Sequence, residues 1–249
     1  MIIAAAQTIP FDEDVDANLN AHYKFVELAA RHHVQLLIFP ELSLTGYLRE
    51  NALNFAFTET DARLSTLRDL AVVNKMIIVV GAPLILISSL HIASFVLYPD
   101  NTLEFYTKQH LHDGEEEFFV SGTEYNPQIA LEDELFSLAI CADISNPSHP
   151  ENASKSKSTA YLASIFYSKK GIDQGIVLLQ KYAKRYQLNV LLSNYGGLSW
   201  GLEAGGMSSF ITNQGLMKGC STAVGESLLI AVKSEGDWIA EEIPVLHKD

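Results

Sequence analysis

Apolar residues follow two alternating patterns along the first third of the chain. Short continuous apolar runs predict strands that are buried on both faces, as in a parallel sheet. Between these runs, apolar residues recur every three or four positions, which predicts amphipathic helices. The predicted strands are Ile2–Ala6, Leu36–Phe39 and Met76–Val80, and the predicted helices begin near Asp14 and include Leu64, Leu67 and Ala71. This βαβαβ order predicts parallel strands.

The rest of the chain adds hairpins to this alternation. A polar stretch from Lys108 to Asn126 lies between two halves that are rich in strands and helices. No low-complexity linker or repeat divides the halves, so we expect one α/β domain over residues 1–249. The elements predicted here are hairpins around Pro99-Asp100-Asn101 and Asn213-Gln214-Gly215, strands at Leu135–Ile140, Ala160–Phe166, Asn189–Ser193 and Ser227–Val232 (the last strand), a helix from Ile176 to Tyr186, and a loop from Ser145 to Pro150.

Composition narrows the classes of protein that fit. The chain has 249 residues, 48% of them hydrophobic and 19% charged, as in ordinary globular proteins. A net charge of −13 repels phosphate backbones and anionic lipids, so we expect neither a nucleic acid nor a membrane as partner. Two cysteines exclude a disulfide scaffold. The first apolar run lacks the positive charge of a signal peptide, and the longest run is too short to span a bilayer, so we expect a cytoplasmic protein.

Three polar residues stand at the ends of predicted strands. Glu41 follows an apolar strand at the end where ligands bind in parallel sheets, although a solvated or capping glutamate is the commoner case. Lys108 ends a hairpin strand, where a lysine is usually exposed. Cys141 ends another strand before a polar loop, so it is either inert core or a nucleophile. Cys220 has no carboxylate nearby in the sequence, and we expect it to be structural.

A metal site is an alternative for the polar stretch. His110, His112 and Asp113 are residue types that bind transition metals. The sequence places no further ligand beside them, so a metal-dependent hydrolase stays a secondary hypothesis and we expect no metal.

Taken together, three ordered motifs resemble those of the carbon–nitrogen hydrolase family, also called the nitrilase superfamily. They are Phe39-Pro40-Glu41, Tyr106-x-Lys108-x-His110-Leu111 and Ile140-Cys141-x-Asp143, and the elements Gly46-Tyr47, Phe119-x-x-Gly122 and Asn194-x-x-Gly197 extend the resemblance over nearly the whole chain. The resemblance implies a four-layer α-β-β-α sandwich without a cofactor. It also implies a homodimer or a higher even homo-oligomer.

The resemblance assigns roles to individual residues. Cys141 is the implied nucleophile, Glu41 the general base, and Lys108 the cation that stabilises the oxyanion together with the backbone N–H of Ala142. A second, assisting glutamate is implied four residues before Phe119, which is Glu115. The acidic run leaves this register open, with Glu116 and Glu117 as the other choices. Tyr47, Ala142 and Asn194 are expected to contact the substrate.

The implied activity is hydrolysis of carbon–nitrogen bonds other than peptide bonds, with a small linear amide or an N-carbamoyl compound as substrate. A true nitrilase is one alternative. A catalytically silent member that binds a small ligand or a partner protein is another, because the segment after the cysteine departs from the family pattern. Ala142 stands where an aromatic residue is frequent, and Ser145-Asn146-Pro147 stands where Arg-Phe-Pro-Glu is common.

Overall fold

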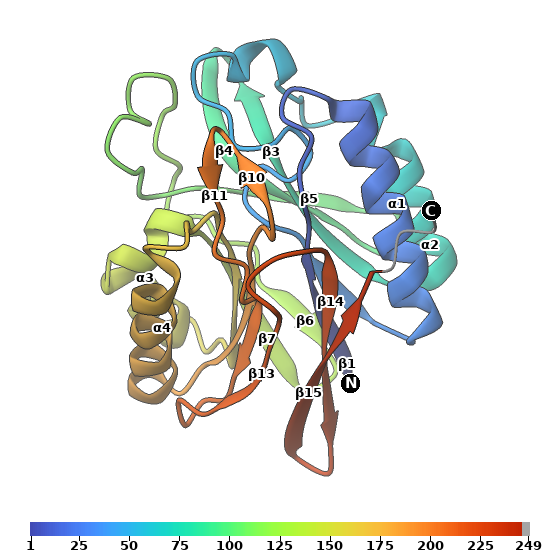
Figure 1. Cartoon of the computed structure of the whole chain (residues 1–249), viewed down its shortest axis with the longest axis vertical. Coiled ribbons are helices and arrows are strands. Elements are labelled where there is room, and N and C mark those ends of the chain that lie inside the picture. Colours follow the sequence, from blue (N-terminus) through green and yellow to red (C-terminus); the bar gives the residue numbers. More distant parts are fainter. Residues whose placement is uncertain (246–249) are drawn as a thin grey trace.

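Two large β-sheets pack face to face, and helices cover the outer side of each sheet (Figure 1). This computed structural model of the chain describes residues 1–245. The arrangement is the four-layer α-β-β-α sandwich that the resemblance implied, so the predicted fold class is confirmed. The predicted domain end at residue 249 lies outside the described residues.

The first sheet has seven strands, and its three central strands are parallel to each other. In spatial order its strands are β15 (Asp237–Pro244), β14 (Ser227–Ser234), β1 (Ile2–Gln7), β2 (Leu36–Ile38), β3 (Ile77–Leu86), β4 (Ser89–Leu97) and β5 (Leu103–Thr107). Its outer face is covered by α1 (Val15–Arg31) and α2 (Ser65–Asn74). Helix α1 begins where Asp14 accepts a hydrogen bond from the backbone N–H of Ala17, which is an N-cap.

The second sheet has six strands and also contains three parallel strands at its centre. In spatial order its strands are β13 (Met217–Cys220), β12 (Ser209–Ile211), β9 (Asn189–Ser193), β8 (Ala160–Ser164), β7 (Glu134–Ile140) and β6 (Ile129–Leu131). Its outer face is covered by α3 (Ser148–Lys155) and α4 (Ile172–Tyr186). The remaining elements are a hairpin of β10 (Leu198–Ser199) and β11 (Leu202–Glu203), and the 3₁₀ helices η1 (Ala52–Phe55), η2 (Ala62–Leu64) and η3 (Cys141–Ser145).

The continuous apolar runs are explained by burial on both faces of each sheet. In β2, Leu36 and Ile38 point into the core between the sheets, whereas Leu37 packs under the helices of the first sheet. Successive side chains of a strand point to opposite faces, so both sets of positions must be apolar. The helices are amphipathic for the same reason, and within residues 1–245 none combines the length and apolarity needed to cross a bilayer.

Two predictions about local structure are wrong. The segment from Ser145 to Pro150 is not a loop throughout, because α3 begins at Ser148. A proline is tolerated in the first turn of a helix, where its missing N–H has no intrahelical partner, and Pro150 occupies this turn. Strand β14 is not the last strand, because β15 pairs with it along its whole length. Exposed acidic residues such as Asp237 and Glu241 mark β15 as an edge strand and mask its apolar pattern.

One glycine brings the first sheet close to the segment that follows β2. Gly81 lies in β3, and a Cβ atom at this position would lie 2.8 Å from the carbonyl oxygen of Pro40 and closer still to the backbone nitrogen of Leu42. Only a residue without a side chain allows this approach. The position of Glu41, between these two residues, therefore depends on Gly81.

We expect Gly81→Ala to lower the free energy of unfolding by about 1–3 kcal/mol, because the added methyl group overlaps backbone atoms that must shift. Urea unfolding measures this change. Gly171→Ala is the matched control, since the nearest atom to its added Cβ lies 3.9 Å away, and it should change stability by less than about 0.5 kcal/mol. Equal effects of the two substitutions would contradict the close approach.

Candidate active site

Glu41, Lys108, Glu115 and Cys141 come together at one end of the two sheets. Glu41 and Cys141 follow the carboxyl ends of β2 and β7, and Lys108 follows the end of β5. The Lys108 ammonium donates hydrogen bonds to Glu41 Oε1 at 2.7 Å and to Glu115 Oε2 and Oε1 at 2.8 and 2.9 Å. All three charged side chains are buried. The four residues that the sequence singled out for catalysis are thus neighbours.

The acidic run contributes one glutamate to this group. Glu115 is buried and contacts Lys108, whereas Glu116 and Glu117 are exposed. Glu115 also accepts a hydrogen bond from the Tyr47 hydroxyl at 2.6 Å and from the backbone N–H of His112 at 2.8 Å. Both of its carboxylate oxygens are therefore fully used.

The two glutamates differ in their proton affinity. Burial raises the pKa of Glu41 to about 7, although the charge of Lys108 opposes this. Burial also acts to raise the pKa of Glu115, but Lys108 and the hydrogen bonds to its carboxylate hold that pKa below its ordinary value. Glu41 Oε2 has no hydrogen-bond partner within residues 1–245. Glu41 therefore has an unused acceptor atom and can exchange a proton near neutral pH, whereas the surroundings of Glu115 favour its ionised form.

The surroundings of Cys141 favour its protonated thiol form. Burial and the nearby charge of Glu41 raise the pKa of Cys141 well above its ordinary value. Its Sγ lies 3.8 Å from the carbonyl oxygen of Phe166, which is a weak contact. A nucleophilic thiolate at this position needs a base to remove the proton. The backbone of Cys141 has φ +43°, in the left-handed region that non-glycine residues rarely adopt.

Asp143 fastens this strained turn to the segment that carries Lys108. Its Oδ1 accepts hydrogen bonds from the backbone N–H groups of Gln109 and His110, at 3.0 and 2.8 Å. Its Oδ2 accepts from the N–H of Ile140 at 2.9 Å and from the Tyr106 hydroxyl at 2.7 Å. No role for Asp143 was predicted from the sequence. Asp143 lies in the first turn of η3. Acidic side chains at such positions often accept hydrogen bonds from the N–H groups at the start of a helix, and this pattern could have indicated its role.

The buried side chain of His149 supports Asp143 through Tyr106. His149 Nε2 lies 2.8 Å from the Tyr106 hydroxyl, and its Nδ1 lies 2.7 Å from the Tyr161 hydroxyl. Burial lowers the pKa of His149, which keeps it neutral. Since Tyr106 donates to Asp143, we assign the His149 proton to Nε2. The segment after Cys141, which departs from the family pattern, thus supplies an uncharged histidine that supports the turn at Cys141.

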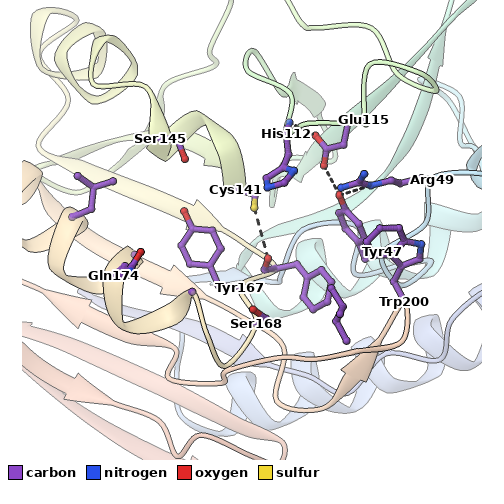
Figure 2. Close-up of a pocket in the computed structure, with 15 residues that line it drawn as sticks. Tyr47, Arg49, His112, Glu115, Cys141, Ser145, Tyr167, Ser168, Gln174 and Trp200 are labelled. Atoms are coloured by element: carbon purple, nitrogen blue, oxygen red, sulfur yellow. Dashed lines mark hydrogen bonds between the residues drawn. The ribbon is translucent and has the colours of Figure 1, made fainter.

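A cavity of about 470 Å³ opens above Cys141 (Figure 2). Cys141, Glu115 and Tyr47 line it, whereas Glu41 and Lys108 lie beneath it, outside the lining. Apart from Arg49 and His112, the other walls are apolar or uncharged, and include Phe166, Tyr167, Gln174, Leu178 and Trp200. The cavity is large enough for a small organic substrate next to the thiol.

The three residues expected to contact substrate occupy different places. Tyr47 lines the cavity. Ala142 lies in the first turn of η3, where N–H groups have no partner within the helix. Asn194 lies behind the wall, where its side chain hydrogen-bonds the backbone N–H and carbonyl of Tyr167 and the carbonyl of Gly206. Asn194 therefore holds the wall at Tyr167, and the substrate contacts of all three residues stay predictions.

The alternative metal ligands do not gather into a site. His110 Nδ1 lies beside the side chain of Asn146, and His112 Nδ1 lies beside the carbonyl oxygen of Asp113. Within residues 1–245, no group of three or more histidine, cysteine, aspartate or glutamate side chains has the arrangement of a metal site.

Solved structures of one amidase share this fold. The NitN amidase from Neterenkonia sp. AN1 superposes with a TM-score of 0.84 at 22% identity, covering 95% of this chain and 94% of that one. A cysteine-to-alanine variant of the amidase from Nesterenkonia sp. AN1, in complex with butyramide, has a TM-score of 0.82 at 21% identity, with 92% and 89% covered. A glutamate-to-glutamine variant, with acrylamide added at the active-site cysteine, has a TM-score of 0.83 at 22% identity, with 95% and 94% covered.

These likenesses, at such low identity, establish the fold. No curated protein matches the sequence. The sequence pattern of the carbon–nitrogen hydrolases, however, matches residues 2–235, which is nearly the whole chain. The protein therefore belongs to the carbon–nitrogen hydrolase family and is a hydrolase that acts on carbon–nitrogen bonds.

Proposed function

We propose that the protein hydrolyses small linear amides or N-carbamoyl compounds through a thioester on Cys141. The observation that carries this proposal is the buried Glu41–Lys108–Glu115 group next to the cysteine that lines the cavity. The second cysteine, Cys220, lies on β13 and contacts Ser209 instead. Complexes of the neighbouring amidase with butyramide and acrylamide support a small amide as substrate.

In the first step, Glu41 removes the thiol proton and Cys141 Sγ attacks the carbonyl carbon. The unpartnered Oε2 of Glu41 is the acceptor that suits this transfer. The C=O electron pair moves onto oxygen, where the Lys108 ammonium and the Ala142 N–H stabilise it. One such donor contributes about 3–4 kcal/mol. Lys108 donates twice to Glu115, so it can redirect one N–H to the oxyanion while the ion pair persists.

In the second step, the protonated Glu41 gives its proton to the leaving nitrogen and the C–N bond breaks. Ammonia or an amine departs, and the acyl group stays on Sγ. A water molecule then attacks the thioester while Glu41 accepts its proton. The C–S bond breaks, the acid leaves, and Cys141 recovers its proton. Glu115 does not titrate in this cycle, because its role is to keep Lys108 charged and in place.

Asp143 is the positioning residue in this scheme. Its carboxylate joins the backbone before Cys141 to the backbone after Lys108. The nucleophile and the oxyanion-binding cation come from different sheets, so their separation depends on such a link.

We expect Cys141→Ala to lower amide hydrolysis by a factor of about 1,000 or more, because Cys141 is the one thiol in the described cavity lining and the proposed thioester forms on it. Ammonia release from small amides, ureido acids and nitriles measures this loss.

Iodoacetamide should label Cys141 faster than Cys220, and Glu41→Gln should slow the labelling of Cys141 only. Equal, slow labelling of both thiols would favour the catalytically silent alternative.

We expect kcat/KM to fall as pH decreases through about 7. Glu41 must be deprotonated to accept the thiol proton, and its raised pKa places this transition near neutrality. A pH–rate profile with an uncharged amide tests this. An acid limb near the ordinary glutamate value of about 4.3 would contradict the assignment.

We expect Asp143→Asn to lower kcat by about 10- to 100-fold with little change in KM, and to cost about 1–3 kcal/mol of stability. The amide cannot accept all four hydrogen bonds. Steady-state kinetics, urea unfolding and the labelling rate of Cys141 measure the effect. Asp133→Asn is the control, because it removes one exposed ion pair with Lys233, which Glu134 also pairs, and it should change neither property measurably. A stability loss with unchanged kcat would contradict the positioning role.

A further inference from the structure

One charged side chain in the cavity wall has no part in the chemistry described above. Arg49 lines the cavity together with Cys141 and Glu115, and it contributes the one lysine or arginine side chain of the described lining. Figure 2 shows its guanidinium pointing inward, beside the Tyr47 hydroxyl and Glu115. An arginine in this position forms part of the surface that a bound substrate would touch.

Arg49 is held firmly in one orientation. Its Nε donates to the Tyr47 hydroxyl at 3.0 Å and its Nη1 to the carbonyl oxygen of Asp113 at 3.1 Å. Its guanidinium carbon lies 4.5 Å from the centre of the Trp200 ring. A Cβ at Gly114 would lie 2.8 Å from Nη1, so this glycine leaves the room that the guanidinium occupies. A cation fixed in this way needs little further ordering to bind a ligand.

The charge of Arg49 is not neutralised by a carboxylate. Within residues 1–245 it forms no ion pair, and its Nη2 group has no hydrogen-bond partner. Two acidic side chains that bond the same neighbours, Tyr47 and Trp200, have other partners. Glu115 bonds Lys108, Tyr47 and His112, while Asp12 accepts from the Ser199 hydroxyl and the Trp200 N–H. Stacking on Trp200 leaves the edge of the guanidinium open for a carboxylate in its plane.

The buried ionic group disfavours an anionic substrate, so binding such a substrate requires a cation in the cavity lining. Glu41, Lys108 and Glu115 together carry one net negative charge when both carboxyls are ionised. That charge repels an anion entering the cavity, and Arg49 balances it. The opposite wall, with Ser145 and Gln174, is polar but uncharged. The anionic end of a substrate is therefore favoured at Arg49, the one arginine or lysine of the described lining.

We propose that Arg49 determines substrate specificity, and that the preferred substrates are small amides that carry a carboxylate at the end remote from the scissile bond. This inference rests on the proposed amide hydrolysis at Cys141. The carboxylate of the substrate accepts hydrogen bonds from the edge of the Arg49 guanidinium that carries Nη2, while the carbonyl carbon of its amide lies next to Cys141 Sγ. The competing role, in which Arg49 merely orients Tyr47 and Glu115, makes no distinction between charged and uncharged amides.

The test compares each acid with an uncharged substrate of equal length. The probes are succinamate and 4-oxopentanamide, in which a methyl ketone replaces the carboxylate, and the corresponding pairs one methylene shorter and one or two longer. Ammonia release gives kcat and KM for each. We expect the wild-type protein to prefer the acid of at least one pair. Arg49→Gln should lower kcat/KM for that acid by about 10- to 100-fold, mainly through KM, and change the ketone less than about threefold.

Two controls separate recognition from support of the site. Tyr47→Phe removes the hydroxyl that links Arg49 to Glu115, but the Asp113 carbonyl oxygen and the Trp200 ring still hold the guanidinium, so a preference for the acid over the ketone should persist even if both are hydrolysed more slowly. In the unaltered protein, raising salt from about 0.05 M to about 0.5 M should raise KM for the acid alone, because salt screens the ion pair. This measurement needs no variant to fold.

The outcomes also separate this inference from the function on which it rests. If ketones and acids are hydrolysed equally well, or if Arg49→Gln lowers both equally, amide hydrolysis stands and the role of Arg49 is contradicted. If no probe releases ammonia above the Cys141→Ala blank, the proposed function is contradicted and this inference falls with it.

Discussion

The buried ammonium of Lys108 is the group on which the rest of the site depends. Burying a lysine and two glutamates costs several kcal/mol for each ion, and only close pairing offsets this cost. Glu41 follows β2, whereas Lys108 and Glu115 both lie in the polar stretch after β5, so the pairing fixes these two segments relative to each other. Removing one partner would leave an uncompensated charge in the core. The ionic group thus constrains the fold in addition to its proposed role in the reaction.

This constraint makes two similar carboxyls behave differently. Glu115 accepts from Lys108 through both oxygens and also from Tyr47 and His112, so its charged form is stabilised. Glu41 accepts a single hydrogen bond from Lys108, and burial raises its pKa to about 7. An unequal division of hydrogen bonds therefore leaves one carboxyl whose ionised form is favoured and one that can exchange a proton near neutral pH, as the proposed base must.

Gly81, Asp143 and His149 hold the segments around the ionic group in place. Gly81 allows β3 to pass the backbone beside Glu41. Asp143 connects the strained Cys141 turn to the segment after Lys108, and His149 supports Asp143 through Tyr106. Each support uses backbone groups or buried side chains from elements far apart in the sequence. Their common effect is to hold the groups of the proposed active site, which come from two sheets, at a fixed separation.

The sequence by itself determined the central strands, the helices α1, α2 and α4, and the three motifs that carry Glu41, Lys108 and Cys141. These features are local, because periodicity and strand-end motifs are properties of neighbouring residues. It did not determine α3, whose first turn contains a proline, or β15, whose acidic residues mask its apolar pattern. Only the tertiary structure selected Glu115 from three adjacent glutamates, gave Asp143 its four donors, and brought Arg49 beside Trp200. Those choices depend on contacts between segments that only folding brings together.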